Sequence, residues 1–316
     1  MSKIDINTIL QSQIWDISSK TFNGVRVLDM NLRQLEQICR LYGFTKFLTE
    51  SKGQVKLAKT AKELGIYSIG ISISPYTLGR LEDDLSNIID VCTNATTSCK
   101  QSCVIQFGGN PAYLDGKQRA MLGRKRMLAD DPTLFLAVAL RYIELKSDKC
   151  IRDGIAMTCR LNISSDIIWE KVICHMGDWG TCFSNLVYHL CARTSNGDII
   201  PYDYTKHFDR HRDVHYHKVY SVTDHDVSKA ETAIANGMPL AVVFDTPRNR
   251  YLPTEYTIGK FTLPVYDGYK HDYTPIHGRD THIVGLRFKH QAKHNKAQRE
   301  AVLSKHILSG FVKMAG

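Results

Sequence analysis

The sequence predicts an α/β protein, organised as a partial or irregular (β/α) barrel. Helix-like and strand-like segments alternate along most of the chain, which is the order of parallel βαβ units. Polar, chemically capable residues directly follow one apolar strand after another, as they do at the carboxyl ends of barrel strands. About six strands can be recognised, fewer than the eight of a complete barrel.

Three parts are expected along the chain. Residues 1–60 form an N-terminal helical extension, 61–290 a barrel-like catalytic domain with a cysteine-bearing loop, and 291–316 a basic C-terminal helix or tail. The sequence contains no internal repeat and no low-complexity stretch that would suggest another division.

The elements of the first half follow from periodicity and from helix-end signals. Apolar residues at helical spacing predict a helix over 32–42, and a basic amphipathic helix over 54–65 ends at a glycine. The apolar run 67–74 is expected to be a strand. An Asp cap followed by proline begins a helix over 130–145, and 154–162 reads as a buried strand with a polar end.

The second half continues the alternation. A helix is expected over 169–175, and another begins at the cap Asp226 and ends at 236–237. The expected strands are 198–206, 218–223, 240–245, 261–266 and 282–288.

Composition narrows the class of protein. The chain has 316 residues, 43% of them apolar and 23% charged, which is ordinary for a globular protein. Membrane-spanning runs and a signal-peptide core are both absent from the sequence, so we expect a protein of a cytoplasm, bacterial or host, with no membrane partner. The formal net charge of +9 favours polyanionic partners such as nucleotides or nucleic acid, although a solvated basic tail over 287–299 accounts for much of the excess.

Three of the nine cysteines lie in one short loop. Cys92, Cys99 and Cys103 have the spacing C-x6-C-x3-C. Three thiolates can bind an iron–sulfur cluster or a metal ion and leave one coordination position open for chemistry. Iron–sulfur is the leading interpretation, with a zinc site or no metal as the alternatives. The spacing differs from the C-x3-C-x2-C of radical S-adenosylmethionine enzymes.

The other six cysteines are interpreted mainly as small core residues, because an odd number of cysteines in a chain without an export signal does not indicate a disulfide framework. Cys174 and Cys182 flank a short loop, and either is a candidate fourth ligand.

Polar residues at the strand ends supply the other candidate site residues. Asp166, Tyr202 and Lys206 are the candidate catalytic residues, because acidic, phenolic and amino groups can transfer protons or hold a base and a phosphate. The candidate cofactor-binding residues are Arg160, Asn162, Ser165, Asp245 and Asp272. The alternatives are an Arg–Asp pair that closes a loop and an ordinary half-exposed strand over 202–206.

Histidines recur over 207–217, and the strongly polar surroundings favour an exposed loop over a catalytic metal site. Asp267 and Asp272 flank a polar turn for which a hairpin is the simpler interpretation and a cation site the alternative.

Taken in order, the motifs resemble the phage gene-product-88 family over about residues 66–290. The matching pieces are Ile73-Ser-Pro-Tyr, the cysteine spacing, the segment from Arg160 to Glu170, Tyr202-Asp-Tyr-Thr-Lys, Tyr220-Ser-Val-Thr, Val243-Phe-Asp, Asp267-Gly-Tyr-Lys-His-Asp and Val284-Gly-Leu-Arg. The family usually has an acidic residue where this chain has Tyr269, which weakens the cation interpretation of that turn. The resemblance implies a phage-encoded protein made in the bacterial host cytoplasm, and it brings no established reaction. A radical S-adenosylmethionine barrel is similar by fold-level analogy alone.

Three functional hypotheses follow. The first is an enzyme with a [4Fe–4S] cluster on the three cysteines, with S-adenosylmethionine as a candidate ligand and a nucleotide or nucleic-acid-related substrate. The second is a zinc-stabilised basic module that binds nucleic acid and modulates host processes. The third is a metal-dependent nuclease or hydrolase that uses Asp245, Asp267 and the histidines. The sequence does not determine the oligomeric state.

Overall fold

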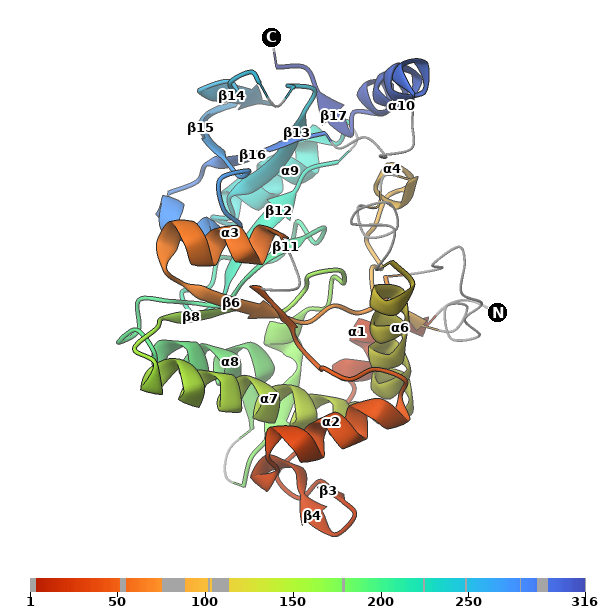
Figure 1. Cartoon of the computed structure of the whole chain (residues 1–316). Helices are drawn as coiled ribbons and strands as arrows, with labels where there is room; N and C mark the ends of the chain where they lie inside the picture. Colours follow the sequence, from red (N-terminus) through yellow and green to blue (C-terminus); the bar gives the residue numbers. More distant parts are fainter. Residues whose placement is uncertain are drawn as a thin grey trace. The chain divides into compact units, whose positions relative to one another are not determined.

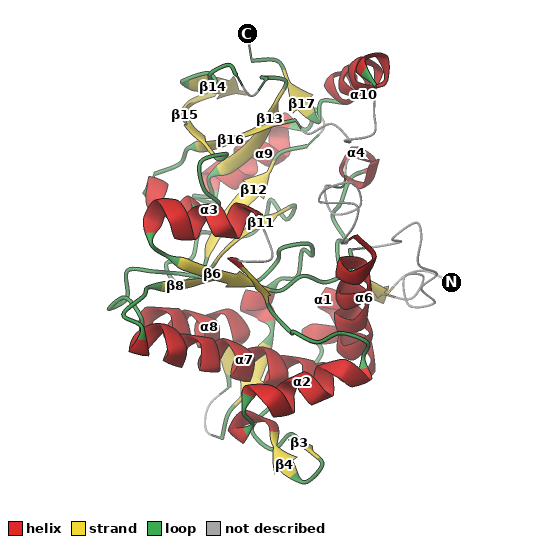
Figure 2. Ribbon diagram, in the orientation of Figure 1, coloured by secondary structure: helices red, strands yellow, loops and turns green. Residues whose placement is uncertain are grey.

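The computed structural model describes residues 4–51, 55–75, 89–101, 103, 114–177, 180–223, 225–247, 249–278, 280–288 and 295–315 (Figure 1). The chain divides into a first unit, Met1–Thr93 with Asn110–Pro201, and a second unit, Asn94–Gly109 with Tyr202–Gly316. Both units contain helices and strands, so the predicted mixed α/β class is confirmed (Figure 2).

The first unit contains the longest helices that the structure describes. Its helices are α1 (Ile6–Leu10), α2 (Leu32–Leu41), α3 (Val55–Leu64), α6 (Leu114–Asp130), α7 (Pro132–Arg152) and α8 (Phe183–Ala192), with 3₁₀ turns at Val27–Asp29 and Trp169–Lys171. Its strands are β1 (Ile4–Asp5), β2 (Trp15–Asp16), β3 (Thr21–Phe22), β4 (Val25–Arg26), β5 (Thr49–Glu50), β6 (Tyr67–Gly70), β7 (Ile89–Asp90), β8 (Met157–Arg160), β9 (Ile173–His175) and β10 (Thr181–Cys182).

Three strands of this unit pair in the order β8-β6-β5. β6 and β8 are parallel and α6 and α7 connect them, so they form the predicted βαβ arrangement, while β5 is antiparallel to β6. Helix α3 packs on β6, and α8 packs on β8 and on α7 (Figure 1). Polar residues that follow β6 and β8 in the chain are therefore brought to the same edge of the sheet.

Helix α7 contributes a large share of the unit's core. Its predicted start is confirmed, because the Asp131 side chain accepts a hydrogen bond from Leu134 N and proline occupies the first turn. The apolar run after Leu134 is buried almost continuously, and Phe135 contacts Phe47 edge-on with ring centroids 5.0 Å apart. A helix that is apolar on nearly all sides is stabilised by burial rather than by its own propensity.

The helix expected over 169–175 is wrong. One 3₁₀ turn ends at Lys171, and the chain then enters β9, which pairs with β2 and with β10. Trp169 is fully buried, and its ring packs on Phe183 at a centroid distance of 5.0 Å. Pairing with a strand near the N-terminus overrides the local helical pattern, because the backbone groups of β9 are satisfied by distant partners.

The second unit is built around a larger sheet. Its helices are α4 (Thr97–Gln101), α9 (Val227–Ala235) and α10 (Lys296–Leu308), with a 3₁₀ turn at Thr274–His277. Its strands are β11 (Tyr202–Thr205), β12 (His217–Ser221), β13 (Leu240–Phe244), β14 (Glu255–Ile258), β15 (Phe261–Asp267), β16 (Ile283–Arg287) and β17 (Val312–Lys313).

The strand order in this unit is β11-β12-β13-β16-β15-β14, with β17 also pairing β13. All of these pairs are parallel except the hairpin β14–β15. Within the described strands, no pairing closes a barrel, so the barrel geometry expected from the sequence is not established. Helix α9 joins β12 to β13 as predicted. The side chain of Asp226 caps its start, and Gly237, with a φ of 75° in the left-handed region, follows its end.

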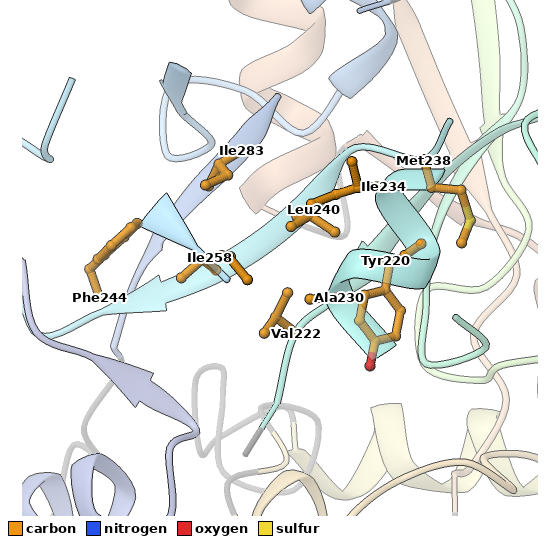
Figure 3. Close-up of a cluster of buried hydrophobic side chains, with 11 residues drawn as sticks. Tyr220, Val222, Ala230, Ile234, Met238, Leu240, Phe244, Ile258 and Ile283 are labelled. Carbon is orange, nitrogen blue, oxygen red and sulfur yellow. The ribbon is translucent and has the colours of Figure 1, made fainter. Parts of the chain in front are cut away.

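The core of the second unit lies between β12, β13, β16 and α9 (Figure 3). Leu240 of β13 lies beside Ile234 of α9, and Phe244 at the other end of the same strand belongs to the same buried cluster, with Ile258 and Ile283. Truncating one such side chain to alanine costs about 2–5 kcal/mol. This packing holds β12 and β13; β11, which carries Tyr202, pairs with β12, and Asp245 directly follows β13.

Candidate functional site

Cys92 lies two residues after the end of β7, beside the polar loop that follows β8. Its Sγ donates to the main-chain oxygen of Ser164 at 3.6 Å, and its backbone N donates to Asp90 Oδ1 at 2.8 Å. Asp166 N donates to Val91 O at 2.7 Å, so two hydrogen bonds join the segment of Val91 and Cys92 to the loop that contains Ser164 and Asp166. The structure thus brings the backbone of Asp166, a predicted catalytic residue, next to the segment that carries Cys92, a predicted thiol ligand 74 positions earlier in the sequence.

Asn162 organises this loop. Its Oδ1 accepts from Ser165 Oγ at 2.8 Å, from Ile167 N at 3.0 Å and from Trp169 Nε1 at 3.0 Å. Its Nδ2 donates to Ile167 O at 2.9 Å. These four bonds place Asn162 and Ser165, two predicted cofactor-binding residues, in a network that gives the loop its shape.

Arg160 is the last residue of β8, and its backbone oxygen accepts from Ile71 N at 3.1 Å. The side chain is half-buried at the carboxyl end of the parallel pair β6–β8.

Ser164 is a residue of this site that sequence reasoning did not select. Its Oγ donates to Ile73 O at 2.6 Å, and a serine in a run of polar residues carries no signal that would distinguish this role.

The remaining cysteines of the trio belong to the second unit. Cys99 lies in the short helix α4, where its N donates to Thr96 Oγ1 at 3.2 Å, and Cys103 follows that helix. Among the residues that the structure describes, no group of three or more His, Cys, Asp or Glu side chains is arranged to hold a metal ion.

The nine cysteines fall into a partly exposed group and a buried group. All nine are free, and the partly exposed ones are Cys92, Cys99, Cys103 and Cys182. Burial raises the pKa of the Cys39, Cys174 and Cys191 thiols to about 12, which disfavours the thiolate that metal binding requires. Cys174 is therefore a poor candidate for the fourth ligand.

Tyr202 and Asp272 form a buried pair. The Tyr202 hydroxyl donates to Asp272 Oδ2 at 3.0 Å, and neither side chain is accessible to solvent. The Tyr202 ring also meets Tyr273 edge-on, with centroids 5.5 Å apart. A predicted catalytic residue and a predicted cofactor-binding residue are thus in direct contact, and the polar turn after Asp267 contributes one of them.

Lys206 and Asp245 each hydrogen-bond to another segment of the second unit. Lys206 Nζ donates to Ser221 O at 2.7 Å and to Ser221 Oγ at 2.8 Å, which ties β11 to β12 beyond their ladder. Asp245 Oδ1 accepts from Ala315 N at 3.0 Å and helps to fasten the C-terminal segment after β17. Both carboxylate oxygens of Asp267 accept hydrogen bonds from Arg287 Nη1, at 2.8 and 2.9 Å. The guanidinium thus occupies the place at this carboxylate that a bound cation would take.

The histidine-rich connection is only partly the exposed loop that was expected. His211 and His215 are exposed, whereas His207 is buried, with its Nδ1 2.8 Å from Asn94 Nδ2, and His217 is the first residue of β12. Burial, with the positive charges of nearby groups, lowers the pKa of His217 to about 3. His217 is therefore neutral at physiological pH.

The fold and these residues define a mixed α/β protein with a cysteine-bearing loop and a polar loop at the carboxyl end of a parallel strand pair. The sequence model of the family described as gene product 88 matches residues 48–304. The chain belongs to this family, which confirms the resemblance seen in its motifs. No curated protein and no solved structure matches the chain, so the comparisons give the analogy to radical S-adenosylmethionine barrels no support. Within the described residues, helices of the length and apolar character needed to cross a membrane are lacking.

Proposed function

We propose that the protein is a phage-encoded iron–sulfur enzyme whose [4Fe–4S] cluster is held by Cys92, Cys99 and Cys103 and which acts in the bacterial host cytoplasm. The observation that carries this proposal is the distribution of accessible thiols. Three of the four partly exposed cysteines fall within twelve consecutive residues, 92–103, while the others, apart from Cys182, are buried. Thiolates are the ligands that iron–sulfur clusters require, and a cluster with three of them retains one iron position for a small molecule.

The surroundings of Cys92 support the proposal. The strand-end loop places the backbone of Ser164 against the thiol, and the hydrogen bonds of Asn162 hold the loop in shape. Hydrogen bonds and buried surroundings near a thiolate ligand tune a cluster's potential and protect it from solvent. We assign Asp166 and Lys206 as the proton-transferring or substrate-orienting groups, and Arg160 and Asp245 as polar groups that bind the ligand. Tyr202 and Asp272, which are buried and bonded to each other, support these groups from the interior. The proposal does not require a closed barrel.

The substrate class in this proposal is a nucleotide or another small phosphorylated molecule. A net charge of +9 favours an anionic ligand, and in this proposal S-adenosylmethionine is the first co-substrate to test at the open iron position. When bound, the cluster would supply one-electron chemistry or polarise the ligand on its open iron.

The decisive experiment is anaerobic purification followed by iron, sulfide and zinc analysis and a visible spectrum. The proposal expects about four iron and four sulfide per chain, with the broad visible absorbance of a cluster. Cys92→Ala, Cys99→Ala and Cys103→Ala should each reduce iron content and absorbance, and Cys182→Ala, a partly exposed cysteine outside the loop, should leave both unchanged. A spectral change on adding S-adenosylmethionine to the loaded protein would identify the open iron as its site.

One tightly bound zinc per chain, with a colourless protein, would refute the iron–sulfur proposal. That result would favour a zinc-stabilised nucleic-acid-binding module, the second candidate, which the net charge of +9 supports. Binding to DNA or RNA that weakens steeply as salt rises would then be expected, because each phosphate contact releases counterions. Activity that depends on added manganese or magnesium would instead indicate a nuclease or hydrolase.

A further inference from the structure

A pocket of about 400 Å³ lies in the first unit at the carboxyl ends of β6 and β8. Ser72, which follows β6, and Ile163, which follows β8, both line it. Its volume falls in the range of small-molecule sites, and the carboxyl ends of parallel strands are where such sites form in α/β proteins. The other lining residues are Lys46, Leu48, Thr49, Glu50, Lys117, Ala120, Met121 and Arg124.

Arg124 is the most informative residue of this pocket. Its side chain is 4% exposed, and it donates to three backbone oxygens: Phe47 O at 2.5 Å, Lys46 O at 2.7 Å and Ser72 O at 3.1 Å. A guanidinium carries five N–H donors, so two remain for another acceptor. Burial lowers the pKa of Arg124 to about 10, and the group is still protonated at neutral pH.

The charge of Arg124 is not balanced by a carboxylate. Within the described part of the chain it forms no ion pair, and its three acceptors are neutral carbonyl groups. Buried charges in proteins are normally paired, because an isolated ion in a low-dielectric interior is costly. The missing counter-charge is best supplied by an anion that enters the pocket.

The other charges of the pocket favour the same sign of ligand. Lys46 and Lys117 are exposed lining residues, so the pocket carries three positive groups. Glu50 is the single acidic group among the lining residues, and it is already engaged by Lys146 Nζ at 2.7 Å and by the Tyr67 hydroxyl at 2.7 Å. The balance of charge therefore attracts an anion.

The remaining lining residues indicate what kind of anion fits. Thr49 Oγ1 and Ser72 Oγ are 2.9 Å apart, and since one hydroxyl donates to the other, one O–H remains for a ligand oxygen. Leu48, Met121 and Ile163 give the pocket an apolar side that inorganic phosphate alone would not use. The combination suits a ligand with a phosphate at one end and an organic ring at the other.

We propose that this pocket binds a small organic phosphate of about the size of a nucleoside monophosphate, with Arg124, Lys46 and Lys117 facing its phosphate. Ile163 precedes Ser164, whose backbone contacts the Cys92 thiol, so the pocket wall and the proposed cluster ligand share one loop. That the pocket is the substrate site of an iron–sulfur enzyme rests on the proposed function. That the pocket binds an organic phosphate does not rest on it, because none of the proposed cluster ligands lines the pocket.

Isothermal titration calorimetry of the full-length protein with AMP, adenosine and inorganic phosphate tests the proposal. AMP should bind at least about tenfold more tightly than adenosine, because charge-assisted hydrogen bonds to phosphate are lost with adenosine. AMP should also bind more tightly than inorganic phosphate, which cannot use the apolar side. Equal affinity for AMP and adenosine would refute the phosphate site, and equal affinity for AMP and phosphate would refute the organic ligand.

Variants assign the binding to this pocket. Lys46→Ala and Lys117→Ala should each weaken AMP binding about three- to fivefold, the range of exposed ion pairs. Lys62→Ala, an exposed lysine on α3 that does not line the pocket, is the matched control and should bind AMP as the unmodified protein does. Unchanged AMP affinity in the Lys46→Ala/Lys117→Ala double variant would overturn the assignment.

Arg124→Lys tests the buried cation while keeping its charge. Lysine lacks the planar, forked N–H groups with which a guanidinium binds two phosphate oxygens, so this variant should bind AMP about tenfold more weakly. Because Arg124 also holds three backbone oxygens, its variants are compared by the thermal shift that AMP produces, which reports binding to the folded protein. A full AMP-induced shift in Arg124→Lys would contradict the role given to this residue. Measuring the cluster in the same samples separates the two proposals, since AMP binding without iron refutes only the cluster.

Discussion

Acidification should destabilise the second unit through His217. The Nε2 atom of this side chain is buried and has no hydrogen-bond partner within the described residues. Burial is the main reason for the low pKa of about 3, and the nearby His282, Arg212, His277 and Lys218 lower it further because each opposes an added positive charge. The perturbation is a change of pH from about 7.5 to 5, below the pKa of about 6.5 for a histidine in an unfolded chain.

The sign and size of the effect follow from proton linkage. Below pH 6.5 the unfolded chain takes up a proton at position 217 and the folded chain does not, so stability falls until the pH approaches the folded pKa of about 3. At pH 5 this one group lowers the free energy of unfolding by about 2 kcal/mol, because pH 5 lies about 1.5 units below the unfolded pKa of about 6.5 and each unit contributes about 1.4 kcal/mol. His277, with a pKa lowered to about 4 mainly by burial, acts in the same direction.

Urea unfolding followed by circular dichroism at several pH values measures this loss. His217→Gln removes the titrating group, so its stability should fall by about 2 kcal/mol less than that of the unmodified protein between pH 7.5 and 5. His211→Gln, in the same connection but exposed, controls for the removal of an imidazole. The reasoning is refuted if His217→Gln and the unmodified protein lose stability in parallel.

Three further predictions concern stability, each measured by urea unfolding. Asn162→Ala should cost about 3 kcal/mol or more because it leaves several buried partners unsatisfied, and a loss below about 1 kcal/mol would contradict its role in the loop. Gly70→Ala should cost about 3 kcal/mol because its Cβ would lie 2.4 Å from Arg160 O, whereas Gly116→Ala, with open space around it, should be neutral or stabilising; equal effects would argue against the close approach of β6 and β8. Asp226→Ala should cost about 1 kcal/mol through loss of the α9 cap, and no loss would show that the cap is not used.

Local signals in the sequence were sufficient for many elements. The helix over 32–41, the caps at Asp131 and Asp226 and the strands β12, β13 and β16 follow from periodicity and capping, because these depend on residues within one or two turns. The segment 169–175 could not be predicted in this way, since its strand exists only through pairing with β2 and β10.

The sequence by itself therefore determined the α/β class, several of the helices, most of the longer strands, the family and the cysteine spacing. Tertiary structure alone decided that Tyr202 meets Asp272 across 70 residues and that Arg124 reaches backbone oxygens 52 to 78 residues away. The physical reason is that burial and pairing are properties of assembled segments: a guanidinium lacks a counter-charge only once the chain has folded around it, and that condition leaves no mark on its neighbours in sequence.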